Sequence, residues 1–132
     1  MSKGNGYYHV TWDTLEDYPG ETSRIYSGPL ACENFAFLIN RQEPHASGVM
    51  HSHRDAEEVY VLLRGRGVLI VEDTRIEMGP LDAVRVEAGR EHASENPFDE
   101  EAWWLVTGSP VDEFMEFDPV AYGPPVQDAA SA

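Results

Sequence analysis

The stretch GVMHSHRDAEEVYVLLRG, residues 48–65, decides the fold of this chain. Within it, His51 and His53 are separated by one residue, so in an extended strand both side chains project from the same face. Two imidazoles side by side make half of a metal site, and Glu58 and the more distant His92 can supply the rest. Imidazole together with carboxylate suits iron, manganese, nickel, cobalt, copper or zinc. The pattern therefore predicts one divalent transition metal held by side chains from separate parts of the chain.

Glycine and proline recur at short intervals, and runs rich in β-branched and aromatic residues lie between them. Many short strands with regular turn signals are typical of an all-β sandwich or barrel. Residues 11–18 could hold one helical turn, and we expect no amphipathic helix. The predicted strands are residues 8–12, 35–41, 47–51, 57–63, 67–72, 82–87, 92–95 and 102–107.

Length and composition limit the classes of function. With 132 residues and no internal repeat, the chain has room for one domain with one core. The net charge of −15 argues against binding to nucleic acid or anionic membranes, because both need lysine and arginine to neutralise phosphate. Cys32 is the single cysteine, which excludes an intrachain disulfide and fits a reducing compartment. No apolar run reaches the length of a signal peptide or a membrane span, so we expect a cytoplasmic protein.

The first motif resembles that of the cupins. In that family a glycine precedes a His-x-His pair, a glutamate follows, and another glycine comes after six further residues. Here Gly48 precedes His51 and His53, four residues separate His53 from Glu58, and six separate Glu58 from Gly65. The glycine before His51 is closer than the family norm.

The second cupin motif is also matched, with departures. Residues 89–96, GREHASEN, resemble its end, including the histidine ligand and the asparagine. Gly79 resembles its opening glycine, although the spacing that follows is two residues longer. Glu87 stands where the family usually has proline, and Leu81 where it usually has glycine. The resemblance covers roughly residues 34–107.

The resemblance implies an all-β jelly-roll fold, a double-stranded β-helix barrel. It implies a mononuclear site with His51, His53, Glu58 and His92 as ligands of one divalent metal. A cupin of this size is expected to be a dioxygenase, isomerase or lyase acting on a small oxygenated organic molecule, and to form a homodimer. The alternative is a binding or sensing module that holds metal and a small ligand without turnover, because this fold hosts many chemistries.

Two residues beside the ligands leave questions open. Glu57 also satisfies the variable gap of the first motif, and alternation along the strand places Glu58 and Tyr60 on one face and Glu57 on the other. Hydrophobicity alone would bury the Glu57 face, whereas the spacing to Gly65 selects Glu58. Tyr60 could reach the metal cavity as a catalytic proton donor or base, or could pack in the core.

The two ends of the chain and the remaining large side chains carry weaker sequence signals for structure than the two motifs do. We expect residues 1–20 to form an N-terminal arm, 21–110 the barrel, and 111–132 a partly disordered extension with Phe114, Phe117 and Tyr122 as apolar contacts. Trp103 and Trp104 are adjacent, so they must point to opposite faces, one toward the cavity and one toward a core or dimer surface. Other residues are expected to be mainly exposed or paired, with one arginine able to reach a substrate carboxylate: His9, His45, Arg64, Arg66, Arg85 and the acidic residues of 91–101.

Overall fold

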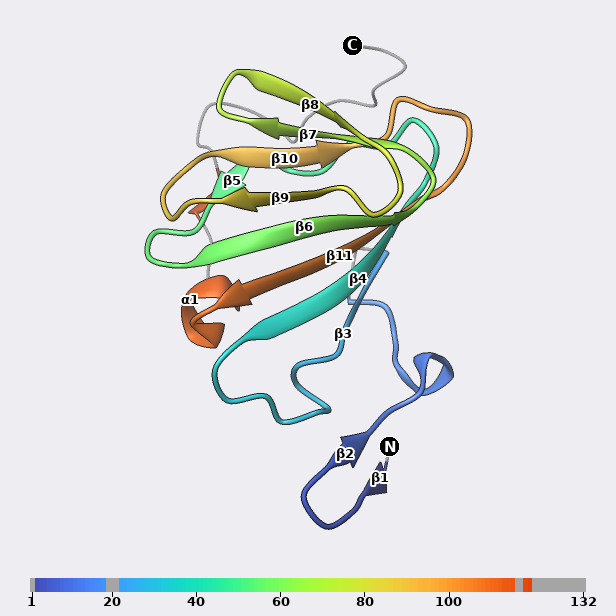
Figure 1. The fold of residues 1–132 in the computed structure, drawn as a ribbon, viewed down its shortest axis with the longest axis vertical. Helices are drawn as coiled ribbons and strands as arrows, with labels where there is room; N and C mark the ends of the chain where they lie inside the picture. The colour runs from blue at the N-terminus through green and yellow to red at the C-terminus, as the bar shows by residue number, and fades with distance from the viewer. Residues whose placement is uncertain (1, 19–21, 116–117, 120–132) are drawn as a thin grey trace.

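Two five-stranded antiparallel sheets face each other in the computed structural model of the chain (Figure 1), which describes residues 2–18, 22–115 and 118–119. One sheet has the order β12-β5-β10-β7-β8 and the other the order β3-β4-β11-β6-β9. This arrangement confirms the predicted all-β jelly-roll barrel. The elements are β1 (Ser2–Lys3), β2 (Tyr8–His9), the 3₁₀ turn η1 (Trp12–Thr14), β3 (Ser23–Ile25), β4 (Ala36–Gln42), β5 (His51–Ser52), β6 (Glu57–Arg64), β7 (Gly67–Val71), β8 (Thr74–Met78), β9 (Ala83–Val86), β10 (His92–Glu95), β11 (Ala102–Ser109), α1 (Val111–Met115) and β12 (Asp118–Pro119).

The central strands β6 and β11 alternate between buried and partly exposed residues along most of their length. In β6 the buried face carries Glu58, Tyr60 and Leu62, and the face with Val59 and Val61 is only partly covered. The more hydrophobic face therefore lies outside. Because successive side chains point to opposite sides of a strand, one face of β6 combines core packing with a buried carboxylate.

The core fills the end of the barrel around Trp104, which is 1% exposed. Its indole Nε1 donates a hydrogen bond of 3.0 Å to Gln42 Oε1, which satisfies the one polar atom of the ring. Leu62 and Leu69 are fully buried in the same cluster. Gly67 leaves room for the indole ring of Trp104, because a Cβ at this position would lie 2.3 Å from the ring.

All eight predicted strands correspond to strands in the structure, although some are shorter. Residues 47–51 form only an isolated bridge at Ser47, paired with Glu95, and the short strand β5. The helical turn expected within 11–18 is η1. The sequence signals did not predict β1, β3, β8, α1 or β12. Strand β8 is mostly exposed, so its sequence TRIEM lacks the apolar alternation that marks a half-buried strand.

The N-terminal residues form a small two-stranded sheet, β1 with β2, that hangs away from the barrel in Figure 1. Leu15 is buried, and Arg24 donates a hydrogen bond to the carbonyl oxygen of Trp12, which ties this segment to β3. At the other end, α1 and β12 belong to the expected C-terminal extension, whereas Phe117 and Tyr122 lie outside the described residues. The predicted domain boundaries stay predictions.

Within the described part of the chain, no helix has both the length and the apolar character that a membrane-spanning helix requires.

Gly65 provides a test of how the hairpin between β6 and β7 closes. Its φ is +81°, and a Cβ would lie 2.3 Å from the carbonyl oxygen of Glu101. We expect Gly65→Ala to lower the free energy of unfolding by about 1–3 kcal/mol, because an L side chain is strained there and meets backbone. Urea denaturation measures the change.

Gly28→Ala is the matched control, because a Cβ at Gly28 meets no atom within 4 Å and its φ is not in the left-handed region. It should change the stability by no more than about 0.5 kcal/mol. Equal effects of the two substitutions would contradict the explanation.

Candidate metal centre

Four side chains from both sheets meet between them. His51 lies on β5 and His92 on β10, where the two residues are paired directly across the strands. His53 follows β5, and Glu58 comes from β6 in the opposite sheet. One ligand atom from each lies within 4.8 Å of all the others. The structure therefore brings together the four residues that the sequence predicted as metal ligands.

Backbone carbonyls orient two of the imidazole rings. Nδ1 of His51 lies 2.8 Å from the carbonyl oxygen of Val49, and Nδ1 of His92 lies 2.8 Å from that of Arg90. A carbonyl can only accept a hydrogen bond, so each Nδ1 carries a proton, and in the neutral ring Nε2 then keeps its lone pair. Such outer contacts set the tautomer and the ring angle that a metal ligand needs.

Glu58 is a carboxylate with 1% exposure, surrounded by imidazole rings. Its Oε2 lies 3.5 Å from His53 Nε2, and its Oε1 is in direct contact with His92 Nε2. Neither Glu58 Oε1 nor His92 Nε2 has a hydrogen-bond partner among the described residues, and both atoms are closed to solvent. Buried polar atoms without partners are costly, and a cation among them would satisfy both. The donor set thus fits a divalent metal.

Burial changes the acid–base properties of two residues here. It lowers the pKa of His51 to about 4, with the neighbouring His92 adding to the effect, so His51 stays neutral at ordinary pH. Burial, together with the charge of Glu58, raises the pKa of Tyr60 well above its ordinary value. The Tyr60 phenol therefore keeps its proton and is suited to donate a hydrogen bond rather than to act as a base.

A contact between α1 and the site has no signal in the sequence. Phe114 is buried and stacks on His53, with ring centroids 5.2 Å apart and planes 9° apart. Gly108 on β11 allows this, because a Cβ there would lie 2.0 Å from the Phe114 ring. Phe114 was expected only as an apolar contact of the tail, and no motif marks it as part of the site.

The alternative glutamate points away from the site. Glu57 is exposed and forms an ion pair with Arg85, with 2.6 Å between Glu57 Oε2 and an Arg85 nitrogen. Trp103 and Trp104 lie on opposite faces as predicted: Trp104 is in the core, and Trp103 lies outside against Trp12, with 5.4 Å between ring centroids. Neither indole belongs to the cavity lining, so the expectation that one of them points toward the cavity was wrong.

Other predicted residues lie away from the centre. His45 contacts Asp99 at the surface, with 2.7 Å between His45 Nε2 and Asp99 Oδ1, and His9 is exposed on β2. Arg64 and Arg66 are exposed, and Arg66 covers the Phe98 ring. The fully buried Asn96 amide binds the carbonyl oxygens of residues 42, 43 and 100, so it holds loops together.

A cavity of about 670 Å³ opens beside the cluster of His51, His53, Glu58 and His92. Its volume lies within the range of small-molecule sites in proteins. His51, His53 and Glu58 line it, and Tyr60 and Phe114 add aromatic surface. Three of the four predicted metal ligands therefore face a space large enough for a small organic molecule.

Comparison with protein families gives one match, in which the model of the Cupin domain covers residues 39–108. This range includes all four clustered side chains and the cavity-lining residues Asn40 and Gln42 of β4. No curated protein sequence matches the chain.

Solved structures share the fold at low sequence identity. A sugar phosphate isomerase of the cupin superfamily from Silicibacter pomeroyi is 24% identical, with a TM-score of 0.67 over 78% of this chain and 76% of the other. A cupin 2 conserved barrel domain protein from Salinispora arenicola is 18% identical, with a TM-score of 0.67 over 84% and 93%. A variant of Bacillus subtilis oxalate decarboxylase is 15% identical, with a TM-score of 0.74 over 94% of this chain and 36% of that enzyme.

The lowered pKa of His51 predicts how the stability of the metal-free protein depends on pH. Between pH 6.5 and about 4 the unfolded chain takes up a proton on this imidazole while the folded protein does not. The stability is therefore fully present above pH 6.5 and falls as the pH drops toward 4, by up to about 3 kcal/mol. Thermal melts with chelator present measure the loss.

His51→Gln removes this titration and should flatten the curve over the same pH range. His9→Gln is the control at an exposed histidine and should leave the slope as it is in the wild type. An unchanged slope in His51→Gln would contradict the assignment.

Proposed function

The chain belongs to the Cupin domain family, and we propose that within it the protein is a metal-dependent enzyme acting on a small oxygenated organic molecule. One observation carries the proposal: three imidazoles and a buried carboxylate converge beside a cavity, with two ligand atoms unpartnered among the described residues. A closed structural metal site has no need of such a cavity. The reaction is of the dioxygenase, isomerase or lyase type.

His51, His53, Glu58 and His92 would hold the metal, which is iron, manganese, nickel, zinc, copper or cobalt. When bound, such a metal supplies a Lewis acid that polarises a coordinated oxygen. In their neutral forms, His51 and His92 would have their Nε2 lone pairs available, because carbonyls hold their Nδ1 protons. The ligand set would therefore be ready before the metal arrives.

Tyr60 is the proposed catalytic side chain. It lies edge-on to His92, with 5.7 Å between ring centroids, and it lines the cavity. Its raised pKa keeps the hydroxyl protonated, so Tyr60 would donate a hydrogen bond to a substrate oxygen as negative charge develops there. Phe114 would keep the His53 ring in place and exclude water from that side.

Two structural neighbours are enzymes by name, a sugar phosphate isomerase and an oxalate decarboxylase. Both names describe reactions of small oxygenated molecules, in line with the class proposed here. They do not fix the reaction of this chain, because the fold supports many chemistries. The cytoplasmic location expected from the composition stays a prediction.

We also propose that the protein is a homodimer. Apolar side chains lie half-buried on the outer face of the sheet that contains β4, β6 and β11, among them Val59, Val61, Ile39 and Leu105. A second copy would cover this surface, which a monomer leaves partly in water. Light scattering after gel filtration at micromolar concentration should give the mass of two chains, and a monomer would contradict the proposal.

Metal retention provides the direct test of the site. Protein purified without added metal should contain about one equivalent of a transition metal by elemental analysis. We expect His51→Ala to lose most of it, because removal of one ligand typically weakens a four-ligand site by orders of magnitude. A full equivalent in His51→Ala would overturn the ligand assignment.

The matched control is His45→Ala, which removes a histidine that pairs with Asp99 at the surface. It should retain the wild-type metal content. Water-proton relaxation of the manganese-loaded protein then separates enzyme from binding module. Exchangeable water on the metal supports the enzyme, and a fully shielded metal favours a module without turnover.

A further inference from the structure

Neutral polar side chains form part of the lining of the cavity beside the proposed metal centre, whereas Glu43 and Glu58 are its acidic lining residues. Apart from its two tyrosines, six of its lining residues carry uncharged hydroxyl or amide groups, and they come from β3 and the residue before it, from β4, from β10 and from the loop before β5. They are Thr22, Ser23, Asn40, Gln42, Ser47 and Ser94. Hydroxyl and amide groups bind other hydroxyl groups well, since each can donate or accept a hydrogen bond.

No lysine or arginine lines this cavity. The chain has nine such residues, and all of them lie in the described part of the structure. Five are held by acidic side chains elsewhere. These ion pairs are Arg24 and Arg41 with Asp17, Arg75 with Glu95, Arg85 with Glu57, and Arg90 with Glu72.

The remaining cations are also away from the wall. Lys3 lies over the Tyr8 ring in the N-terminal hairpin, and Arg66 lies over Phe98. Arg54 and Arg64 are exposed and do not line the cavity. A phosphate group entering here would find no guanidinium or ammonium partner on the protein, in a chain whose net charge is already −15.

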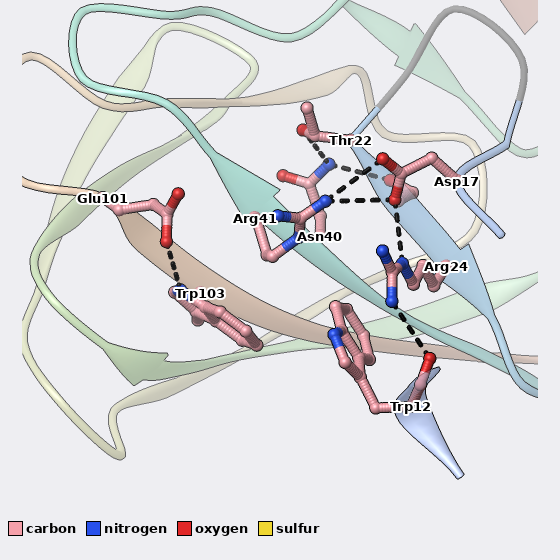
Figure 2. Close-up of polar contacts among 9 residues, drawn as sticks. Trp12, Asp17, Thr22, Arg24, Asn40, Arg41, Glu101 and Trp103 are labelled. Atoms are coloured by element: carbon pink, nitrogen blue, oxygen red, sulfur yellow. Dashed lines mark hydrogen bonds and ion pairs between the residues drawn. The ribbon is translucent and has the colours of Figure 1, made fainter. Parts of the chain in front are cut away.

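Strand β4 shows how this separation arises. Figure 2 shows Arg41 turned to Asp17, with 3.1 Å from an Arg41 nitrogen to either Asp17 oxygen, and Arg24 reaching the Trp12 carbonyl. Asn40 precedes Arg41, so its side chain points to the opposite face and lines the cavity. The strand places its cation outside and its amide inside.

The wall is built to present hydrogen-bonding groups. Asn40 Nδ2 donates to Ser23 Oγ at 2.7 Å and to Thr22 Oγ1 at 3.4 Å, so both hydroxyls keep their own hydrogens to donate. Gln42 is fixed between Trp104 and the Ser94 carbonyl.

Ser47 provides a second, independent observation that points to a ligand in this cavity. Its Oγ is buried and has no hydrogen-bond partner among the described residues. A buried hydroxyl without a partner is costly, and a ligand hydroxyl beside it would remove that cost.

We propose that the cavity takes an uncharged, polyhydroxylated small molecule of the sugar or polyol type and selects against phosphorylated ones. This inference rests on the proposed function, because residues that would hold the metal line the same cavity as the polar side chains that would bind the hydroxyls of the molecule. The aromatic faces of Tyr60 and Phe114 and the side chain of Leu38 suit the C–H surfaces of such a molecule.

Calorimetric titration of the manganese-loaded full chain tests the selection. The probes are D-glucose and D-fructose, each compared with its 6-phosphate. We expect each sugar to bind at least about tenfold more tightly than its phosphate, because charge repulsion and the lack of a cation oppose the phosphate. Phosphates that bind as well as the sugars, or no detectable binding of either sugar, would overturn the inference.

A gain-of-function variant sharpens the result. Asn40→Arg puts a guanidinium on the cavity wall and should raise the affinity for the 6-phosphates by about tenfold or more. Asn34→Arg is the matched control: the substitution and the charge change are the same, but Asn34 is exposed and does not line the cavity. Equal gains in both variants would indicate a general charge effect and contradict the assigned wall.

The two proposals fail in different ways. Elemental analysis of the same samples shows whether the metal is present before any sugar is added. Loss of metal from the wild type overturns the proposed function, whereas retained metal with phosphate preference overturns only the selection proposed here. The comparison in the wild type decides this even where Asn40→Arg does not fold.

Discussion

The burial of one carboxylate is the physical constraint on which the rest of this structure depends. Glu58 has 1% exposure and lies between imidazoles from the opposite sheet. An ionised carboxylate out of water is costly unless cations or hydrogen-bond donors surround it. In the described part of the chain, its Oε1 has no hydrogen-bond partner and faces His92 Nε2. The two sheets therefore meet at a point that a metal ion can stabilise.

The barrel supports this arrangement by fixing the orientation of the clustered imidazole rings. Carbonyl oxygens hold Nδ1 of His51 and His92, and Phe114 covers the face of His53. Each contact comes from backbone or from an apolar ring rather than from a further charged group. The cavity beyond the ligands is similarly free of lysine and arginine, so the proposed metal would be its dominant positive charge.

Much of the fold could be predicted because its central strands carry local signals. The His-x-His pair, the alternation from Glu58 onward and the turn glycines mark strands by periodicity alone. Strand β8 was not predicted because its sequence, TRIEM, is largely exposed and polar. Its position depends on pairing with β7. Helix α1 has only five residues, too few for a helical period to be read.

The sequence by itself determined which side chains could bind a metal and which of them share a strand face. Alternation along β6 separates Glu57 from Glu58 in any extended strand, but it does not say which face turns inward. Tertiary packing places the face with Val59 and Val61 on the outside and brings Phe114 against His53. It also leaves no arginine in the lining of the cavity. The physical reason is that periodicity is a local property of the backbone. What covers each face depends on contacts between residues far apart in the chain.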